Sequence, residues 1–142
     1  MEPMISEVYK MRILIAEDDF ASRKFLYKFL SNYGECDMTI DGEETLEAFS
    51  MAYDEGAPYD LICLDIMMPK MDGIKVLKNI REIEDERGID EKERVKIIMT
   101  TALNDVKNVF DSFETGCQAY ASKPIDTQKL VEVMKKLGFP VD

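Results

Sequence analysis

The sequence predicts an α/β fold, a doubly wound sheet of five parallel strands that alternate with five helices. Two observations lead to this prediction. Short apolar runs recur five times along the 142 residues, and each is followed by a segment whose apolar residues are spaced as on one face of a helix. Strands that alternate with helices in this way form parallel sheets, with right-handed crossovers and helices on both faces.

The five expected strands are short, and most are rich in aliphatic and β-branched residues. They are residues 12–16, 36–40, 59–64, 95–100 and 117–121. The first, RILIA, is almost entirely apolar, which is typical of a strand that is buried on both faces of its sheet. The second has the weakest pattern, because polar residues interrupt it.

The expected helices carry an apolar stripe and end at turn residues. They are residues 20–32 and 43–54, a helix that opens at 72–73, a helix marked by Val106, Phe110 and Phe113, and residues 126–137. The inward side of the first helix is expected to hold Ala21, Phe25, Leu26 and Phe29. The charged stretch 84–94 is interpreted as a frayed helix end followed by a solvated loop.

Composition indicates one globular domain at residues 11–139, after a short polar tail at 1–10 and without an output domain. The chain lacks the basic start of a signal peptide and the run of about 18 apolar residues that spans a membrane. A cytoplasmic location is therefore expected. The net charge of −11 disfavours binding to nucleic acid or to an anionic membrane, because both depend on Lys and Arg.

The cysteine and histidine content excludes several kinds of site. Cys36, Cys63 and Cys117 lie far apart, and the chain has no CxxC motif and no histidine, which argues against a zinc site. The cysteines are expected to be reduced, buried thiols. Without histidine the chain cannot use Ser-His-Asp or Cys-His catalysis, and it cannot itself carry a phosphohistidine.

Polar residues follow four of the five expected strands. Glu17 and Asp18 follow the first, Asp65 the third, Thr101 the fourth and Lys123 the fifth. Because ligands bind at the carboxyl ends of strands in an open parallel sheet, these side chains are expected to meet at one edge. Asp65 is the strongest candidate, since an acid at the tip of a buried strand is poorly explained by packing. We expect it to be a nucleophile that accepts a phosphoryl group.

Three acids at one edge repel one another, and a divalent cation would relieve the repulsion. Carboxylates together with a backbone carbonyl and water suit Mg²⁺, which phosphoryl transfer also requires. Thr101 and Lys123 are the candidates for holding the remaining phosphoryl oxygens. Taken singly, each residue has a simpler explanation: the acids as helix caps, Thr101 as a strand end, and Lys123 as a solvated surface residue.

Four motifs, ILIAEDD, LDIMMPKMDG, IIMTTA and AYASKP, occur in this order along the chain. With them the chain from about residue 11 to residue 138 resembles the receiver domain of two-component response regulators, in its stand-alone, chemotaxis-type form. The resemblance implies a flavodoxin-like sheet with strand order 2-1-3-4-5. One departure is that the acidic pair reads Glu-Asp rather than Asp-Asp, a change that the family tolerates.

The resemblance also implies the residues of a metal and phosphorylation site. Asp65 matches the phosphoacceptor and a Mg²⁺ ligand. Asp18 matches a direct ligand of Mg²⁺, while Glu17 is expected to act through water. Met67 is expected to contribute its backbone carbonyl, so its side chain is not the ligand.

The same resemblance implies a switch that responds to phosphorylation. Thr101 matches the switch hydroxyl, with Ala102 as the small residue beside it. Tyr120 matches an aromatic side chain that moves between outward and inward rotamers, although simple packing is the alternative. Lys123 matches the lysine that pairs with the phosphoryl oxygens, and its bond to Pro124 is expected to be cis.

The expected function is that of a phosphoacceptor that catalyses only its own phosphorylation and dephosphorylation. A sensor histidine kinase or a histidine phosphotransfer protein would be the donor. The fourth helix, fifth strand and fifth helix would then control an unidentified partner protein, with the chain as a monomer or as a phosphorylation-dependent dimer. The resemblance also implies that the residues two positions past the acceptor and past the switch hydroxyl influence loss of the phosphoryl group. Here these residues are Met67 and Leu103, and because both are apolar, slow loss is expected.

Two rival functions remain open from the sequence. A phosphohydrolase with an aspartate nucleophile would have similar topology, but such enzymes carry a second acid two residues after the first, where this chain has Met67. A scaffold with the same shape and no phosphorylation is the other rival. It would have no need for all of the polar residues at this edge.

Overall fold

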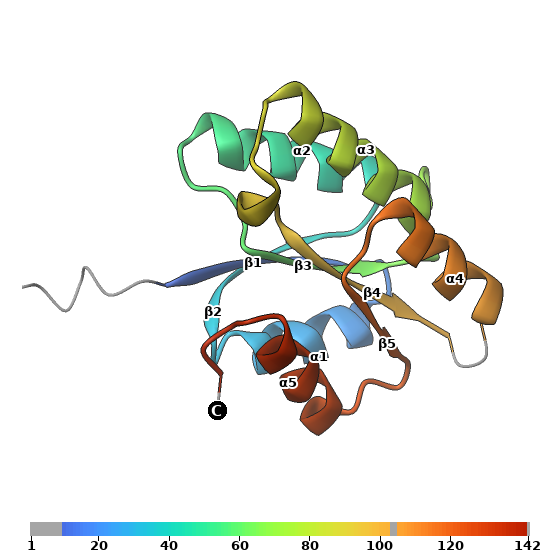
Figure 1. Cartoon of the computed structure of the whole chain (residues 1–142). Coiled ribbons are helices and arrows are strands. Elements are labelled where there is room, and N and C mark those ends of the chain that lie inside the picture. Colours follow the sequence, from blue (N-terminus) through green and yellow to red (C-terminus); the bar gives the residue numbers. More distant parts are fainter. Residues whose placement is uncertain (1–9, 103–104, 142) are drawn as a thin grey trace, which may run out of the picture.

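The computed structural model describes residues 10–102 and 105–141, and it contains one five-stranded parallel sheet (Figure 1). The strands are β1 (Met11–Ala16), β2 (Gly34–Thr39), β3 (Leu61–Asp65), β4 (Lys96–Thr101) and β5 (Ala119–Ser122). Their order in the sheet is β2-β1-β3-β4-β5. The predicted fold class and strand order are therefore confirmed. All five carboxyl ends lie at the same edge of the sheet, because every pair of neighbouring strands is parallel.

Five α-helices cover both faces of the sheet. They are α1 (Phe20–Leu30), α2 (Gly42–Asp54), α3 (Gly73–Glu86), α4 (Val106–Thr115) and α5 (Thr127–Lys136). Helices α2, α3 and α4 lie on one side of the sheet and α1 and α5 on the other (Figure 1). Since side chains alternate along a strand, each face of the sheet contributes to a separate hydrophobic cluster.

The two clusters account for the apolar strand sequences. Leu14, Ile62 and Ile97 point toward α2 and α3, whereas Ile13 and Ile98 point toward α1 and α5. All five residues of β3 are buried, which explains the uninterrupted apolar run before Asp65. Of the three cysteines, Cys63 and Cys117 are buried as predicted, whereas Cys36 on the edge strand is half-buried.

The helix N-termini differ in one respect that matters for the site. Four helices begin after an aspartate whose carboxylate accepts a hydrogen bond from a backbone N–H of the first turn, as an N-cap does. These residues are Asp19, Asp41, Asp72 and Asp126. Asp105 also stands at the N-cap position, before α4, but its carboxylate makes no such bond.

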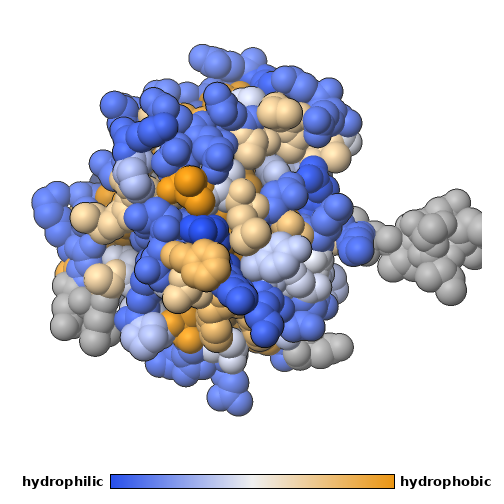
Figure 2. All heavy atoms as spheres, turned by 180° about the vertical axis from the view of Figure 1, so that it is seen from behind, coloured by the Kyte–Doolittle hydropathy of each residue, from blue (hydrophilic) through white to orange (hydrophobic). Residues whose placement is uncertain are grey.

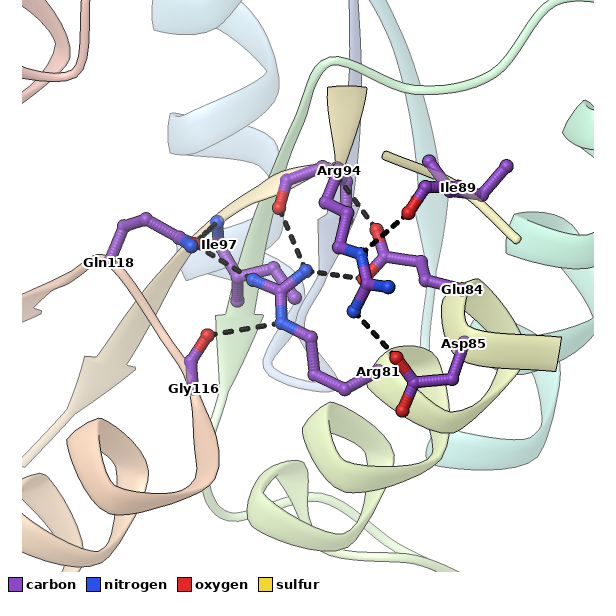
Figure 3. A network of polar contacts seen from close by, with 9 residues as sticks. Arg81, Glu84, Asp85, Ile89, Arg94, Ile97, Gly116 and Gln118 are labelled. Carbon is purple, nitrogen blue, oxygen red and sulfur yellow. Dashed lines mark hydrogen bonds and ion pairs between the residues drawn. The ribbon is translucent and has the colours of Figure 1, made fainter. Parts of the chain in front are cut away.

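The charged stretch 84–94 was predicted to be a frayed helix end and a solvated loop, and this prediction is wrong in part. Helix α3 continues to Glu86, and residues Glu91–Glu93 form a short 3-10 helix. Glu84 is fully buried and pairs with Arg81 at 2.7 Å (Figure 3). A glutamate in a charged stretch does not reveal that a neighbouring arginine will bury it, so the pattern alone predicts exposure.

Arg81 and Glu84 belong to a network that joins α3 to the amino-terminal ends of β4 and β5 (Figure 3). Arg81 donates hydrogen bonds to the carbonyls of Gly116 and Val95 and to the side chain of Gln118. The second carboxylate oxygen of Glu84 accepts from the backbone N–H of Val95 at 2.9 Å. The buried charges are thus paired and hydrogen-bonded, as burial of charge requires.

The predicted inward side of the first helix is wrong in part, and the residues that marked the fourth helix face outward. In α1, Leu26 and Leu30 are buried while Phe25 is exposed. In α4 the predicted helix is present, but the residues that marked it, Val106, Phe110 and Phe113, all lie on the exposed side. Helical spacing identifies a stripe but does not say whether the stripe faces the sheet or the solvent.

The face turned away from the viewer in Figure 1 is mainly hydrophilic, with apolar side chains in small separate groups (Figure 2). None of the helices among the described residues has the length and apolar character needed to cross a membrane.

Candidate functional site

The carboxyl edge of the sheet holds the polar residues that the sequence placed there. Asp65 is the last residue of β3 and Thr101 the last of β4, whereas Glu17 and Asp18 directly follow β1. Lys123 directly follows β5, and its backbone N–H donates to the carbonyl of Thr101 at 2.7 Å. The parallel register therefore brings residues from four strands, far apart in the chain, to one place.

Three of these residues form an acidic cluster. Carboxylate oxygens of Glu17, Asp18 and Asp65 all lie within 4.8 Å of one another. Glu17 and Asp65 are buried, while Asp18 is exposed. The cluster is therefore open to solvent on the side of Asp18 and closed on the side of the sheet.

Lys123 neutralises part of this charge. Its Nζ lies 2.8 Å from Oε1 of Glu17 and 3.2 Å from Oδ2 of Asp65. Burial by itself would lower the pKa of Lys123, but the hydrogen bond and charge of Glu17 and the charge of Asp65 raise it overall. The lysine is thus a firmly held cation that links the acceptor candidate to the acidic pair.

Asp65 is harder to ionise than an ordinary aspartate. Burial, followed by the negative charge of Glu17, raises the pKa of Asp65 to about 6, although Lys123 acts in the opposite direction. The carboxyl is therefore ionised at neutral pH and becomes protonated in mildly acidic solution. Strong perturbation of a carboxyl in a solvent-accessible cluster is typical of functional sites.

The loop after β1 is braced from α1. The guanidinium of Arg23 donates to the carbonyls of Glu17 and Asp18 at 2.9 and 3.1 Å. The backbone N–H of Asp19 donates to the Oε2 of Glu17 at 3.1 Å, and the N–H of Glu17 donates to the carbonyl of Thr39. These bonds fix the acidic pair in front of Asp65. Arg23 was missed at the level of sequence, although it lies one helical turn after Asp19.

The loop after β3 is shaped around Asp65. The N–H of Met67 donates to Oδ1 of Asp65 at 3.2 Å, and the Met67 side chain is 66% exposed. The N–H of Gly73 donates to the carbonyl of Ile66 at 2.7 Å. A Cβ at position 73 would lie 2.2 Å from the carbonyl oxygen of Asp65, so only glycine allows this close return of the chain.

The donor set of the cluster fits Mg²⁺. Carboxylate oxygens are the ligands that this cation prefers. Glu17 Oε1 is buried and pairs with the ammonium of Lys123 at 2.8 Å, which leaves a lone pair of this oxygen for a cation or for its bound water. Asp18 is exposed and offers a carboxylate toward solvent, from which a hydrated ion would enter. The acidic residues present are therefore compatible with a magnesium site.

Thr101 is buried, but its hydroxyl is engaged outside the acidic cluster. It donates to Oδ2 of Asp105 at 3.2 Å. Ala102 beside it is exposed. Asp105 did not emerge from the sequence, where it stands out only as a further aspartate ahead of a helix. Leu103, on which the prediction of slow phosphate loss partly depends, lies outside the described residues.

Tyr120 and Pro124 complete the predicted set. Tyr120 lies in the middle of β5, is 44% exposed and packs edge-on against Phe113 of α4, with ring centroids 6.1 Å apart. Its ring is therefore in an outward position. The peptide bond between Lys123 and Pro124 is cis.

A five-stranded parallel sheet of this order is flavodoxin-like, the fold class to which receiver domains belong. The acidic cluster and the lysine lie at its carboxyl edge. Comparison with known protein families identifies the family within this fold class. The chain belongs to the response regulator receiver domain family, whose profile matches residues 13–135.

Relatives in several organisms agree with this assignment. Two-component response regulator 24 of Arabidopsis thaliana is 32% identical over 133 residues, which cover 93% of this chain and 87% of that protein. Hybrid signal transduction histidine kinase L of Dictyostelium discoideum is 34% identical over 89% of this chain, but the match covers 7% of that protein. Two further relatives, named probable transcriptional regulators, are matched over 49% and 55% of their length. The chain thus spans about half or less of the length of the histidine kinase and of the two transcriptional regulators.

A solved structure of similar fold is that of CheY from Borrelia burgdorferi in a complex with CheX, BeF₃ and Mg²⁺. It is 29% identical, with a TM-score of 0.76, and the match covers 89% of this chain and 88% of that one.

Proposed function

We propose that this receiver domain is a phosphoacceptor in two-component signal transduction and that Asp65 accepts the phosphoryl group. The observation that carries the proposal is the position of Lys123, whose Nζ contacts both Asp65 and Glu17 at the mouth of the acidic cluster. A helix cap or a surface acid has no need of a half-buried lysine shared with a second acid. The BeF₃ and Mg²⁺ in the crystals of the Borrelia CheY complex support the same assignment.

In the proposed reaction a carboxylate oxygen of Asp65 forms a bond to phosphorus as the P–N bond of a phosphohistidine breaks. The imidazole leaves with the bonding electron pair, and the product is an acyl phosphate. Because the pKa of Asp65 is about 6, the carboxyl is ionised and nucleophilic at neutral pH. Lys123 stays close to the attacked group and offers its ammonium to the phosphoryl oxygens.

The acidic cluster would hold Mg²⁺ through Asp18 and Asp65, with Glu17 acting through water and Met67 through its backbone carbonyl. When bound, the ion neutralises charge on the phosphoryl oxygens. The chain's own contribution is to hold these groups: Arg23 fixes the carbonyls of the acidic pair, and the N–H of Met67 orients Asp65.

A partner protein that carries the phosphohistidine would dock beside the cluster. Residues of α1 and of the loop after β5, including Ala21, Phe25 and Pro124, line a cavity of about 260 Å³ together with Lys123. Phe20, which precedes Ala21 in the chain, is exposed. Exposed apolar side chains beside the proposed nucleophile are suited to a donor protein that covers the cluster and excludes water.

The output of phosphorylation would be a change in the surface formed by α4, β5 and α5. Phosphorylation would draw Thr101 and Lys123 toward the new phosphoryl group, and Tyr120 would turn inward into the space that Thr101 leaves. The exposed apolar residues of α4, among them Phe110, then meet a partner protein or a second copy of the chain differently. This is a population shift between two states of the same surface.

Labelling of Asp65→Asn with a radioactive small-molecule phosphodonor and Mg²⁺ tests the proposal. The variant should take up no label, while Asp72→Asn, a change in the same loop at a residue that caps α3, should label like the wild type. Wild-type label should be lost on treatment with hydroxylamine, which cleaves acyl phosphates. Equal labelling of Asp65→Asn would refute the assignment, and steady turnover of a phosphoester by the wild type would favour the phosphohydrolase.

A further inference from the structure

Asp105 stands at the N-cap position of α4, yet its carboxylate does not cap the helix. The aspartates before the other four α-helices of the described chain each accept a hydrogen bond from a backbone N–H of their own helix. Asp105 makes no such bond, so the first N–H groups of α4 have no carboxylate partner. Its carboxylate forms hydrogen bonds with other groups.

The Asp105 carboxylate instead accepts a hydrogen bond from Thr101, the predicted switch residue. Oδ2 of Asp105 accepts the hydroxyl of Thr101 at 3.2 Å and the side-chain amide of Asn108 at 2.9 Å. Thr101 is 2% exposed, so its hydroxyl has little access to water. A buried hydroxyl keeps a partner that it has, because losing it without replacement costs the desolvation of the group.

We infer that Asp105 is a positioning residue that holds the hydroxyl of Thr101 away from the phosphorylation site until a phosphoryl group competes for it. The inference rests on the proposed function, since Thr101 must serve as the switch hydroxyl. On phosphorylation Thr101 exchanges the Asp105 carboxylate for a phosphoryl oxygen. The freed carboxylate then caps α4 through the N–H of Lys107 or Asn108, as aspartate does in the other helices.

The opposite end of α4 does not take part in this exchange. The carbonyl of Gly116, which ends the helix, accepts from the guanidinium of Arg81 at 3.1 Å. Arg81 is itself held by the buried Glu84 (Figure 3). Helix α4 is therefore tied to α3 at its C-terminus, and the proposed exchange concerns its N-terminus, where Asp105 lies.

The inference predicts that removal of the carboxylate favours the activated state. Beryllofluoride with Mg²⁺ serves as the probe, and its affinity is measured by isothermal titration calorimetry. Asp105→Ala should bind it about five- to tenfold more tightly than the wild type, because the competing hydrogen bond to a charged acceptor is gone. Asp105→Asn, which keeps a neutral acceptor, should lie between the two. Asp41→Ala removes the N-cap of α2 and should leave the affinity unchanged.

The same substitution in a Thr101→Ala protein separates an effect on the position of the hydroxyl from the effect of removing a charge. In Thr101→Ala the hydroxyl is absent, so adding Asp105→Ala should change the beryllofluoride affinity by less than about twofold. An equal gain in both backgrounds would mean that Asp105 acts through its charge alone and would overturn the inference. An unchanged affinity in Asp105→Ala and Asp105→Asn would overturn it as well. If beryllofluoride binds no better to the wild type than to Asp65→Asn, the proposed function itself has failed.

Amide exchange measured by NMR tests the new cap directly. Beryllofluoride should slow exchange of the Lys107 and Asn108 amides in the wild type and leave it unchanged in Asp105→Ala. Slowing of the same size in both proteins would contradict the exchange of partners by Asp105.

Discussion

Asp65 shows at the scale of one residue how function acts against stability. Its carboxylate is buried beside Glu17, and burial is the main reason why its pKa rises to about 6. Lys123 offsets only part of this cost, since the net shift is still upward. A neutral side chain at position 65 would be easier to bury, and the ionised acid persists because the proposed chemistry requires it.

The stability of the metal-free protein should therefore depend on pH through Asp65. The folded state binds an extra proton between the ordinary pKa of 3.8 and the folded pKa of about 6, so stability falls as pH rises through this window. Above pH 6 the full cost is present, about 1–2 kcal/mol once screening at the rim is allowed for. The free energy of unfolding of Asp65→Asn should exceed that of the wild type by this amount at pH 7.5. The two free energies should converge near pH 4.

Urea unfolding in EDTA between pH 4 and pH 8 measures this difference. Asp72→Asn is the control, because Asp72 is exposed at the start of α3 and lies outside the acidic cluster. A pH-independent gap between Asp65→Asn and the wild type would show that Asp65 is not the group that titrates.

At the scale of the elements, the Arg81–Glu84 pair holds the end of the sheet opposite to the candidate site. Glu84 is fully buried. The four partners of Arg81 are Glu84 on α3, Val95 directly before β4, Gly116 at the end of α4 and Gln118 directly before β5 (Figure 3). A buried pair of this kind is weak evidence of net stabilisation over an apolar pair, but breaking it leaves a charge without a partner.

Arg81→Ala should accordingly lower the free energy of unfolding by about 3–5 kcal/mol, because Glu84 stays buried without its cation. Arg87→Ala removes a surface ion pair from the same helix, with Asp54 at 2.9 Å, and should cost less than about 1 kcal/mol. Denaturant unfolding compares the two variants. Similar small losses in both would show that the Arg81 network contributes little to the stability of the fold.

The exposed stripe of α4 leads to a different expectation. Phe110 is 63% exposed, so Phe110→Ser should change the free energy of unfolding by no more than about 0.5 kcal/mol. Ile80 of α3 is fully buried between helix and sheet, and Ile80→Ala should cost about 2–5 kcal/mol. A large loss of stability in Phe110→Ser would place that side chain in the core instead of on a contact surface.

At the scale of the whole molecule, the alternation of strands and helices was sufficient to predict the sheet and the edge where the site lies. The position of Glu17, Asp18, Asp65 and Lys123 follows from that topology, because parallel strands end together. The sequence did not predict which face a stripe occupies or which charges become buried. Those features depend on contacts between distant segments, as the pairing of Glu84 with Arg81 illustrates.

The partner of the Thr101 hydroxyl was also beyond sequence reasoning. An aspartate before an α-helix is normally its cap, and four of the five aspartates that precede the α-helices of the described chain behave in this way. Asp105 differs because the end of β4 brings a buried hydroxyl within its reach. Only the assembled fold reveals such competition between a local and a tertiary partner.

The acidic balance of the molecule leads to the last prediction, which concerns Mg²⁺ and stability. With a net charge of −11, the folded chain repels itself, so any salt should stabilise it somewhat by screening. A cation held by Asp18 and Asp65 should add a specific gain, about 1.4 kcal/mol at a concentration ten times its dissociation constant. Unfolding in MgCl₂ and in NaCl of equal ionic strength separates the two effects.

Two neighbouring acids provide a matched pair for this measurement. Asp18→Asn should abolish the difference between MgCl₂ and NaCl. Asp19→Asn should retain it, because the Asp19 carboxylate accepts from the N–H of Ser22 as the cap of α1 and is not part of the acidic cluster. Lowering the pH below 6 should also reduce the specific gain, since protons then compete for Asp65. A magnesium-specific gain that survives in Asp18→Asn would place the cation elsewhere on this acidic surface.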